Sequence, residues 1–293
     1  MNDTLSTPLP AAARRPVRVL DVEARDGAAL ADAIEALYAA RHDVVVLRSA
    51  LDPRVLAATG ERLDNDAAAW SRPNERMPVE DVRLLGTDTP ATPTFRDPRG
   101  ATLEAYLDSA SRHAGRAPAA FEAGFDAGAE IRRVLERCAG GRPVRLLQAD
   151  DGRSFVPYTI RRLVEGTQIG LHHDYHYRLD LYRDLAPRLD TSTLVSFVAT
   201  LRRPQSGGEL FVYGATSDDP AVPRLPNGFS YDQPAVEAQY EHVRLDMNEG
   251  DLFLLAAGRC LHRVGRIVGP RARITMGGFL ALDRARENVL YWS

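Results

Sequence analysis

The sequence has no lysine, because all 37 basic residues among its 293 positions are arginine. This absence excludes a lysine Schiff base, a Walker-type phosphate loop and a kinase-type catalytic lysine, since each depends on a lysine amine. An anionic ligand must therefore be held by arginine, histidine, hydroxyl groups or backbone amides.

Cysteine is nearly as scarce. Cys138 and Cys260 are the two cysteines of the chain, too few for a disulfide framework or a cysteine-rich zinc site. A chain that does not rely on disulfides is typical of a reducing compartment, so we expect a cytoplasmic location.

Long apolar runs and a strong excess of one charge are absent too. No run approaches the roughly 20 residues of a membrane-spanning helix, so we expect no membrane contact. Residues 1–13 contain no compact apolar stretch of the kind found in signal peptides. A net charge of -3 and a pI near 6.2 argue against a nucleic-acid polymer as partner.

We expect one folded domain preceded by a short tail. Hydrophobic residues make up 44% and charged residues 26% of the chain, as in ordinary globular proteins. Residues 1–16 are rich in proline, alanine and arginine and are predicted to be disordered. Residues 17–293 are predicted to form a single domain, with a helical support region at 17–142 and a strand-rich core at 143–293.

The N-terminal half alternates short strands and helices. Strands are predicted at 17–22 and 43–47, with a helix from the N-cap Asp26 to residue 40. Asp52 and Pro53 supply an N-cap and a first-turn proline for the next helix. After a long loop at 70–100, helices are predicted at 101–113 and 119–138, the second of them ended by Gly140-Gly141.

From residue 143 onwards, short β-type runs separated by glycine, proline and aspartate predominate. Strands are predicted at 155–164, 168–174, 193–201, 209–213, 238–245, 251–255 and 273–282, and the long insertions at 177–191 and 214–237 are typical of lids or binding loops. The predicted fold class is mainly β with flanking helices (α+β). Its core is a double-stranded β-helix, or jelly roll, with an N-terminal helical layer.

The segment 170–175 (GLHHDY) contains the most informative pattern in the chain. Side chains alternate along a strand, so His172 and Asp174 lie on one face and can hold one metal ion. His262, after the apolar strand at 251–255, is the candidate third ligand. Two histidines and one carboxylate form the facial triad of non-haem Fe(II) oxygenases, which leaves positions open for oxygen and a cosubstrate. A polar surface strand is the alternative interpretation of so short a motif.

Eleven residues after His262, the segment 273–279 (RITMGGF) adds a second pattern. Arg273 and Thr275 share a strand face, and a guanidinium beside a hydroxyl suits the far carboxylate of a dicarboxylic acid. 2-Oxoglutarate would chelate iron through its 1-carboxylate and keto oxygen and reach Arg273 with its 5-carboxylate. Arg271, two residues earlier, would lie on the same strand face and is the alternative anchor for this carboxylate, although the Gly-Pro before it favours a turn. A structural salt bridge is the other interpretation of Arg273.

These motifs resemble those of the Fe(II)/2-oxoglutarate-dependent oxygenases, in which a strand start like 206–210 (SGGEL) is also common. Within that superfamily the sequence is similar to the carrier-independent halogenases acting on welwitindolinone-type indole alkaloids and to the N-succinyl-amino-acid β-hydroxylases. The similarity covers about residues 150–293 and is carried by 157–163 (PYTIRRL), 250–253 (GDLF), 262–264 (HRV) and 291–293 (YWS).

The resemblance implies a hydroxylase of a small molecule that uses Fe(II), 2-oxoglutarate and O2. The halogenases have glycine where this chain has Asp174, and the missing carboxylate gives chloride its place on iron. With Asp174 present, the resemblance implies that a ferryl species abstracts hydrogen and that hydroxyl rebound follows, with release of succinate and CO2. His172, Asp174 and His262 are then the catalytic metal ligands, while Arg273 and Thr275 bind 2-oxoglutarate.

We expect several further residues to lie in or near the pocket, and for some of them the sequence allows a second interpretation. Ser196 matches a serine that lines the substrate pocket of the halogenases, or it is a hydroxyl bonded within the barrel wall. Arg161 matches an arginine of the halogenase motif and faces cosubstrate or substrate, or it is a surface arginine. Tyr175 is expected to border the substrate. His173 is expected to be a hydrogen-bonding neighbour of the metal site, and His176 to belong to a lid.

Two other functions fit part of the sequence. A cupin-like jelly roll that binds a metal or ligand without turnover would explain the metal motif but would leave Arg273 and Thr275 without a role. A peptidyl prolyl hydroxylase could hold a peptide with the loops at 70–100 and 214–237. For the hydroxylase, the expected substrates are an amino-acid derivative, a nucleotide or an alkaloid-like metabolite, and the sequence does not indicate an oligomeric state.

Overall fold

The computed structural model describes residues 15–66, 83–85, 103–174, 185–190, 192, 194–228 and 230–293. Its elements in chain order are β1 (Val19–Glu23), α1 (Gly27–Leu30), α2 (Ala33–Tyr38), β2 (Val44–Arg48), α3 (Pro53–Asn65), β3 (Arg83–Leu85), α4 (Leu103–His113), α5 (Arg116–Ala119), α6 (Ala127–Cys138), β4 (Val144–Leu146), β5 (Thr159–Leu163), β6 (Ile169–His172), β7 (Val195–Arg202), β8 (Ser206–Gly207), β9 (Leu210–Thr216), α8 (Gln233–Gln239), β10 (His242–Leu245), β11 (Leu252–Leu255), β12 (Cys260–Val264), β13 (Ile267–Val268), β14 (Arg273–Leu282) and β15 (Val289–Trp292).

A large mixed sheet forms the base of the molecule. Among the described residues it has nine strands, with β1-β2-β11-β7-β14-β15-β4 in order, β5 paired with β14, and β3 paired with β5. The ten-residue strand β14 organises this sheet, because β7 runs along one of its sides while β5 and β15 lie end to end along the other. A single long strand therefore connects the two halves of the sheet.

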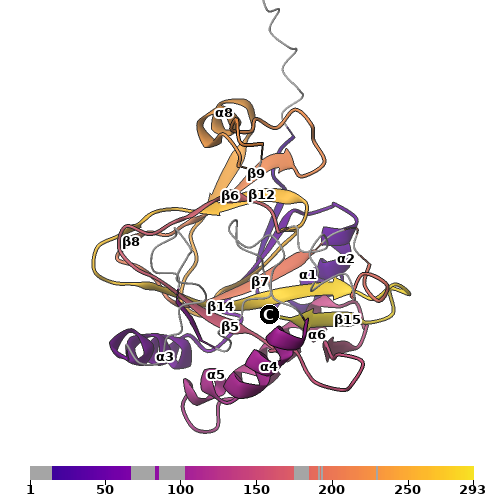
Figure 1. The fold of residues 1–293 in the computed structure, drawn as a ribbon, viewed down its shortest axis with the longest axis vertical. Coiled ribbons are helices and arrows are strands. Elements are labelled where there is room, and N and C mark those ends of the chain that lie inside the picture. The colour runs from indigo at the N-terminus through magenta and orange to yellow at the C-terminus, as the bar shows by residue number, and fades with distance from the viewer. Residues whose placement is uncertain are drawn as a thin grey trace, which may run out of the picture.

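A smaller antiparallel sheet in the order β10-β9-β12-β6 lies over the large one, and β8 and β13 form a short ribbon at one end. Figure 1 shows β6, β9 and β12 above β5, β7 and β14. The chain passes repeatedly between the sheets, since β5, β7, β11 and β14 belong to the large sheet and β6, the hairpin β9–β10 and β12 to the small one. The two sheets are thus built from interleaved segments of the chain.

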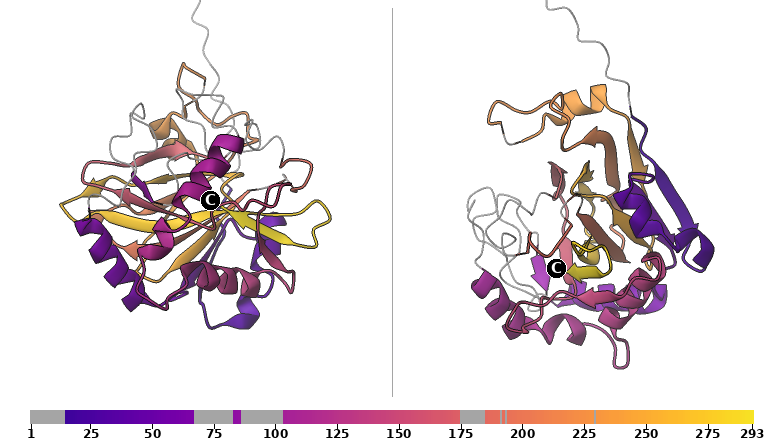
Figure 2. Two further views of the ribbon diagram at one scale, coloured as in Figure 1. Left: turned by 60° about the horizontal axis from the view of Figure 1, so that its bottom comes forward. Right: turned by 90° about the vertical axis from the view of Figure 1, so that its right-hand side faces the viewer.

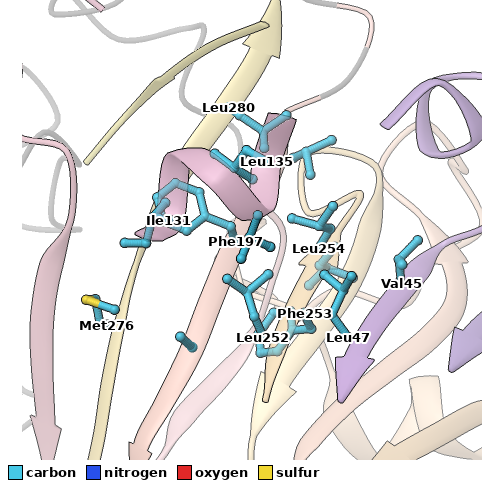
Figure 3. Packing of buried hydrophobic residues seen from close by; sticks show 14 of the residues in the cluster. Val45, Leu47, Ile131, Leu135, Phe197, Leu252, Phe253, Leu254, Met276 and Leu280 are labelled. Carbon is cyan, nitrogen blue, oxygen red and sulfur yellow. The ribbon is translucent and has the colours of Figure 1, made fainter. Parts of the chain in front are cut away.

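Helices cover the outer face of the large sheet. Figures 1 and 2 show α3 to α6 on the side away from the small sheet, and α8 at the opposite end of the molecule. Ile131 and Leu135 of α6 are buried in the same cluster as Phe197, Met276 and Leu280 of the sheet, as Figure 3 shows. The spacing of four residues places both α6 side chains on one helix face, which explains why that face is the buried one.

The central strand β11 has the apolar pattern of a strand that is buried on both faces. All four of its residues are buried, and β11 pairs with β2 on one side and with β7 on the other. Phe253 and Leu255 face the space between the sheets. Leu252 and Leu254 alternate with them and so face the other side of the sheet.

The predicted helices are placed correctly, with two differences in extent. The helix predicted from Asp26 to residue 40 is two short helices, α1 and α2, because Asp32 adopts a φ of -125° between them. The helix predicted at 119–138 begins only at Ala127, where Asp126 accepts a hydrogen bond from the backbone N–H of Ala129. Its C-terminal end is as predicted, since Gly140 has a φ of 64°, in the left-handed region that favours glycine.

The predicted strand at 238–245 is wrong at its start. Residues 238 and 239 belong to α8, which Asp232 caps by accepting the N–H of Ala235, and β10 begins at His242. The insertion at 214–237 is therefore not all loop. The β-type run predicted at 155–164 becomes a strand only from Thr159. The strands that were not predicted are β3, β4, β8, β12, β13 and β15.

Several predictions fall wholly or partly outside the described residues. These are the tail up to residue 14, most of the loop at 70–100, and residues 177–184 of the first insertion. At the edge of the tail, Arg15 forms an ion pair with the buried Asp43 at 3.0 Å. Within the loop region, β3 pairs with β5.

The observed fold class is mixed α+β with several sheets, as predicted at that level. Of the helices that the structure describes, none combines the length and the apolar character needed to cross a bilayer.

We expect Leu254→Ala to destabilise the fold by about 2–5 kcal/mol, because it removes a fully buried side chain between β2 and β7 and leaves a cavity. Leu225→Ala, at a side chain that is 41% exposed, is the matched control and should change the free energy of unfolding by less than about 0.5 kcal/mol. Urea unfolding of both variants measures this, and equal midpoints would contradict the assignment of β11 to the core.

Candidate metal centre and its pocket

A cavity lies between the two sheets and encloses about 660 Å³, counting its open mouth. Polar groups gather in it from both sheets, and apolar side chains form the rest of the wall. The polar side chains are those of Arg161, His172, Asp174, Ser196, His262, Arg273 and Thr275. Every residue that the sequence motifs single out for metal or 2-oxoglutarate binding therefore lines one cavity.

The two histidines form a cross-strand pair. His172 on β6 is opposite His262 on β12, and their ring centroids are 4.2 Å apart. The Nδ1 atom of His172 bonds to the carbonyl oxygen of Gly170 at 2.7 Å, and that of His262 to the carbonyl of Cys260 at 3.1 Å. Because a carbonyl only accepts, Nδ1 carries the proton in each ring and Nε2 keeps the lone pair that a metal needs.

Asp174 completes the cluster from a position just beyond β6. Its backbone N–H donates to the carbonyl of Ala257 at 2.7 Å, in the turn between β11 and β12. Its Oδ1 lies 3.5 Å from Nε2 of His172 and 4.0 Å from Nε2 of His262. The prediction that His172 and Asp174 converge therefore holds, although strand alternation is not the reason, because β6 ends at His172.

The three side chains offer ligand atoms that all lie within 4.8 Å of one another. Burial, followed by the neighbouring His172, lowers the pKa of His262 to about 4, so its imidazole is neutral near pH 7, as a metal ligand must be. Two imidazole nitrogens and one carboxylate oxygen suit a divalent first-row metal such as Fe(II). The three ligand atoms, together with the hydrogen bonds that hold each imidazole through its Nδ1 atom, therefore fit a resident metal ion.

His173 points away from this cluster. Its Nδ1 bonds to the Tyr231 hydroxyl at 2.7 Å, and the two rings meet edge to face. Burial, with a further contribution from His172, lowers the pKa of His173 to about 4. Tyr231 in turn accepts a hydrogen bond from Arg224, so His173 ties the metal-binding segment to the chain beyond β9.

Two arginines face the cavity from neighbouring strands. Arg273 begins β14, and Arg161 on β5 is the cross-strand partner of Thr275. Burial, together with the nearby Arg161, lowers the pKa of Arg273 to about 10, which leaves it charged near pH 7. Burial also lowers the pKa of Arg161, against the attraction of Asp174. Within the part of the chain that the structure describes, neither guanidinium forms an ion pair.

The rival anchor Arg271 lies outside the cavity. Its side chain is exposed and its Nη2 lies 3.4 Å from Oε1 of Glu249. It precedes the first residue of β14, as the Gly-Pro turn signal suggested. Of the two arginines with the same parity, Arg273 is therefore the one available to a ligand in the cavity.

Some features of the site were not predicted. Ser196 donates a hydrogen bond to Oδ2 of Asp174 at 2.6 Å, a partner that sequence analysis had not considered. The apolar wall includes Val198, Leu210 and Phe253. The alternation of side chains along β7, β9 and β11 was the signal in the sequence that could have indicated them. Tyr175 and His176 lie outside the described residues, so their predicted roles stay predictions.

A 2-His-1-carboxylate cluster in a cavity between two sheets, with two arginines lining the same cavity, defines the class of mononuclear non-haem metal oxygenases. The sequence profile described as "Carrier-protein-independent halogenase WelO5" matches residues 16–293. The chain belongs to this family. It is therefore a 2-oxoglutarate- and Fe(II)-dependent oxygenase, an iron-binding oxidoreductase of a family that acts on small molecules.

Solved structures with a similar chain path include three enzymes. One is an N-substituted L-amino acid dioxygenase from Burkholderia ambifaria, with 15% identity, a TM-score of 0.47, and coverage of 90% of this chain and 91% of the other. The second is a prolyl-4-hydroxylase from Pseudomonas putida, with 16% identity, a TM-score of 0.43, and coverage of 86% and 97%. The third is the epimerase SnoN from nogalamycin biosynthesis, with 17% identity, a TM-score of 0.44, and coverage of 87% and 83%. No curated protein sequence matches significantly.

We expect His172→Ala to abolish stoichiometric Fe(II) binding under anaerobic conditions, because it removes one of the three converging ligand atoms. His173→Ala is the matched control in the neighbouring position and should retain the metal, since its ring bonds to Tyr231 instead. Calorimetric titration with Fe(II) measures both. Loss of the metal in His173→Ala together with its retention in His172→Ala would show that the wrong histidine was assigned.

Proposed function

We propose that this protein is a hydroxylase of a small molecule, dependent on Fe(II) and 2-oxoglutarate. The observation that supports hydroxylation is the carboxylate of Asp174, whose Oδ1 lies beside the two imidazole Nε2 atoms. The halogenases that the sequence resembles have glycine at this place. A carboxylate there takes the position that a halide would need, so a hydroxyl group is the expected one to be transferred.

The strand pattern supports a double-stranded β-helix within one domain at 17–293. From β5 to β14 the chain passes repeatedly between the large and the small sheet, with β9 and β10 entering the small sheet as a pair, so that each sheet contains segments distant in sequence. This interleaving is what a jelly roll requires. We assign the helices before residue 142 to support, because they pack on the outer face of the large sheet, and the strands after it to the catalytic core.

The metal ligands are assigned atom by atom. Nε2 of His172, Nε2 of His262 and Oδ1 of Asp174 would hold the iron. When bound, Fe(II) supplies the activation of O2 that is coupled to the conversion of 2-oxoglutarate to succinate and CO2. The protein contributes fixed orientation, since each imidazole is held by a hydrogen bond from its other nitrogen to the backbone.

The cosubstrate is assigned to the arginine side of the cavity. Arg273 would bind the 5-carboxylate of 2-oxoglutarate through two parallel hydrogen bonds. Thr275, two residues further along the same strand, would donate a third hydrogen bond to this carboxylate from its hydroxyl. Arg161 is near both Asp174 and Arg273. The charge of Asp174 raises the pKa of Arg161, against the larger effect of burial, and the charge of Arg161 lowers the pKa of Arg273. We assign it to the same cosubstrate, at the end nearer the metal.

The apolar wall leaves room for a hydrophobic part of the substrate. Val198, Leu210, Phe253 and Phe279 line the cavity beside the polar groups. Such a wall excludes water from the reacting centre and holds a small organic molecule by contact. An amino-acid derivative, a nucleotide and an alkaloid-like metabolite remain the substrate classes to test.

A metal-binding jelly roll without turnover is the second candidate, and the buried arginines oppose it. Burying a guanidinium without a partner is costly, and Arg161 and Arg273 form no ion pair with any residue that the structure describes, so an anionic ligand explains them best. Formation of succinate from 2-oxoglutarate in the presence of Fe(II) and O2 separates the two functions, because a binding protein forms none.

Arg273→Ala should raise the KM for 2-oxoglutarate roughly 10- to 150-fold, since a charge-assisted hydrogen bond to an anion is worth about 1.5–3 kcal/mol. The affinity for Fe(II) should stay close to that of the unchanged protein, because Arg273 is not among the ligands. Arg271→Ala is the matched control at the exposed arginine that pairs with Glu249 and should leave this KM unchanged. The reverse result would move the anchor to Arg271.

With a substrate found by screening for succinate release, the protein should add one oxygen atom and no halogen, even in excess chloride, because Asp174 occupies the halide position. Asp174→Gly should lose most of this activity, and a trace of chlorinated or azidated product would reflect the vacated position. Mass spectrometry of the products measures both. A chlorinated product from the protein with Asp174 intact would overturn the proposal of hydroxylation.

A further inference from the structure

Of the three proposed metal ligands, Asp174 is the one that does not lie on a strand. β6 ends at His172, so the carboxylate is not aligned by the sheet in the way that the two histidines are. Its backbone is tied to Ala257 through the N–H, and this contact places the Cα atom. It does not set the rotation of the carboxylate group, which decides which oxygen faces the metal position.

Ser196 makes a contact that acts on this rotation. Its Oγ lies 2.6 Å from Oδ2 of Asp174, the oxygen other than the one beside the two Nε2 atoms. An ionised carboxylate only accepts hydrogen bonds, so the serine hydroxyl is the donor. Hydrogen bonds to a charged acceptor at this distance are among the stronger ones in proteins.

The serine itself is rigidly placed. It lies on β7, where its cross-strand partners are Leu255 of β11 and Phe279 of β14, and it is 6% exposed. Strand pairing on both sides fixes its backbone. The large sheet thus supplies a fixed donor to a ligand set whose histidines both belong to the small sheet.

We infer that Ser196 is the positioning residue of the metal centre: it holds Oδ2 of Asp174 away from the metal position and thereby directs Oδ1 towards it. A carboxylate held in this way contributes one oxygen and leaves room for ligands from outside the protein. This inference rests on the metal site of the proposed function. It gives Ser196 a role beside the two earlier interpretations, as a substrate contact and as a hydroxyl bonded within the barrel wall, and Ser196 also lines the cavity.

A double-mutant cycle on metal affinity tests whether Ser196 acts through Asp174. Ni(II) is the probe, because it binds imidazole strongly enough for two histidines to retain it without the aspartate. The variants are Ser196→Ala, Asp174→Ala and the double variant, titrated without substrate or 2-oxoglutarate. Thr200→Val is the matched control, since Thr200 is a buried hydroxyl on the same strand that does not line the cavity.

The expected result is that Ser196→Ala lowers Ni(II) affinity about 10- to 100-fold when Asp174 is present, as for other groups that orient metal ligands. In the Asp174→Ala background the same change should have an effect of less than about 2-fold. Thr200→Val should bind as the unchanged protein does. An equal loss in both backgrounds, or no loss in either, would overturn the inference.

A spectroscopic measurement separates positioning from a loss of folding. With Co(II) bound, Ser196→Ala should show a changed visible absorption spectrum, while Ser196→Thr, which retains the donor, should restore the spectrum and the affinity. An unchanged Co(II) spectrum in Ser196→Ala would contradict the inference. Because these tests need neither turnover nor substrate, a protein that binds metal as expected but forms no hydroxylated product would contradict only the proposed function.

Discussion

The pairing of β6 with β12 is the interaction on which the site depends. It sets His172 opposite His262, and because each Nδ1 bonds to a carbonyl of its own strand, the direction of both Nε2 atoms follows from the strand geometry. Asp174 then joins from outside the pairing, through contacts to the turn after β11 and to β7. A metal site built in this way is as rigid as the small sheet that carries it.

Among the residues that the structure describes, two arginines and one acidic side chain line the cavity. Arg161 and Arg273 face it with Asp174 as the acidic group between the sheets, and burial lowers the pKa of both guanidinium groups. Charges held in this way oppose folding unless a partner offsets them. On the proposed assignment, the dianionic 2-oxoglutarate would offset this charge, and the two arginines would favour its binding.

One residue separates the two reactions discussed for this family. The matching profile is named for a halogenase, yet the third ligand position carries the carboxylate of Asp174. The neighbouring Ser196 is bonded to that carboxylate, so the pair forms a unit in which one oxygen faces the imidazoles and the other faces the strand. On the proposed function, the reaction would depend on the carboxylate of Asp174 and on the serine bonded to it.

The sequence by itself determined the metal and cosubstrate motifs and most helix ends. His172 with Asp174 and Arg273 with Thr275 are local patterns, and the predicted caps Asp26 and Asp52 accept hydrogen bonds from backbone N–H groups within three residues. The choice of Arg273 over Arg271, the contact of Ser196 with Asp174 and the helix α8 within a predicted loop were decided by tertiary structure. The physical reason is that these depend on which distant strands pair and on what each side chain then faces, and neither is encoded in neighbouring residues.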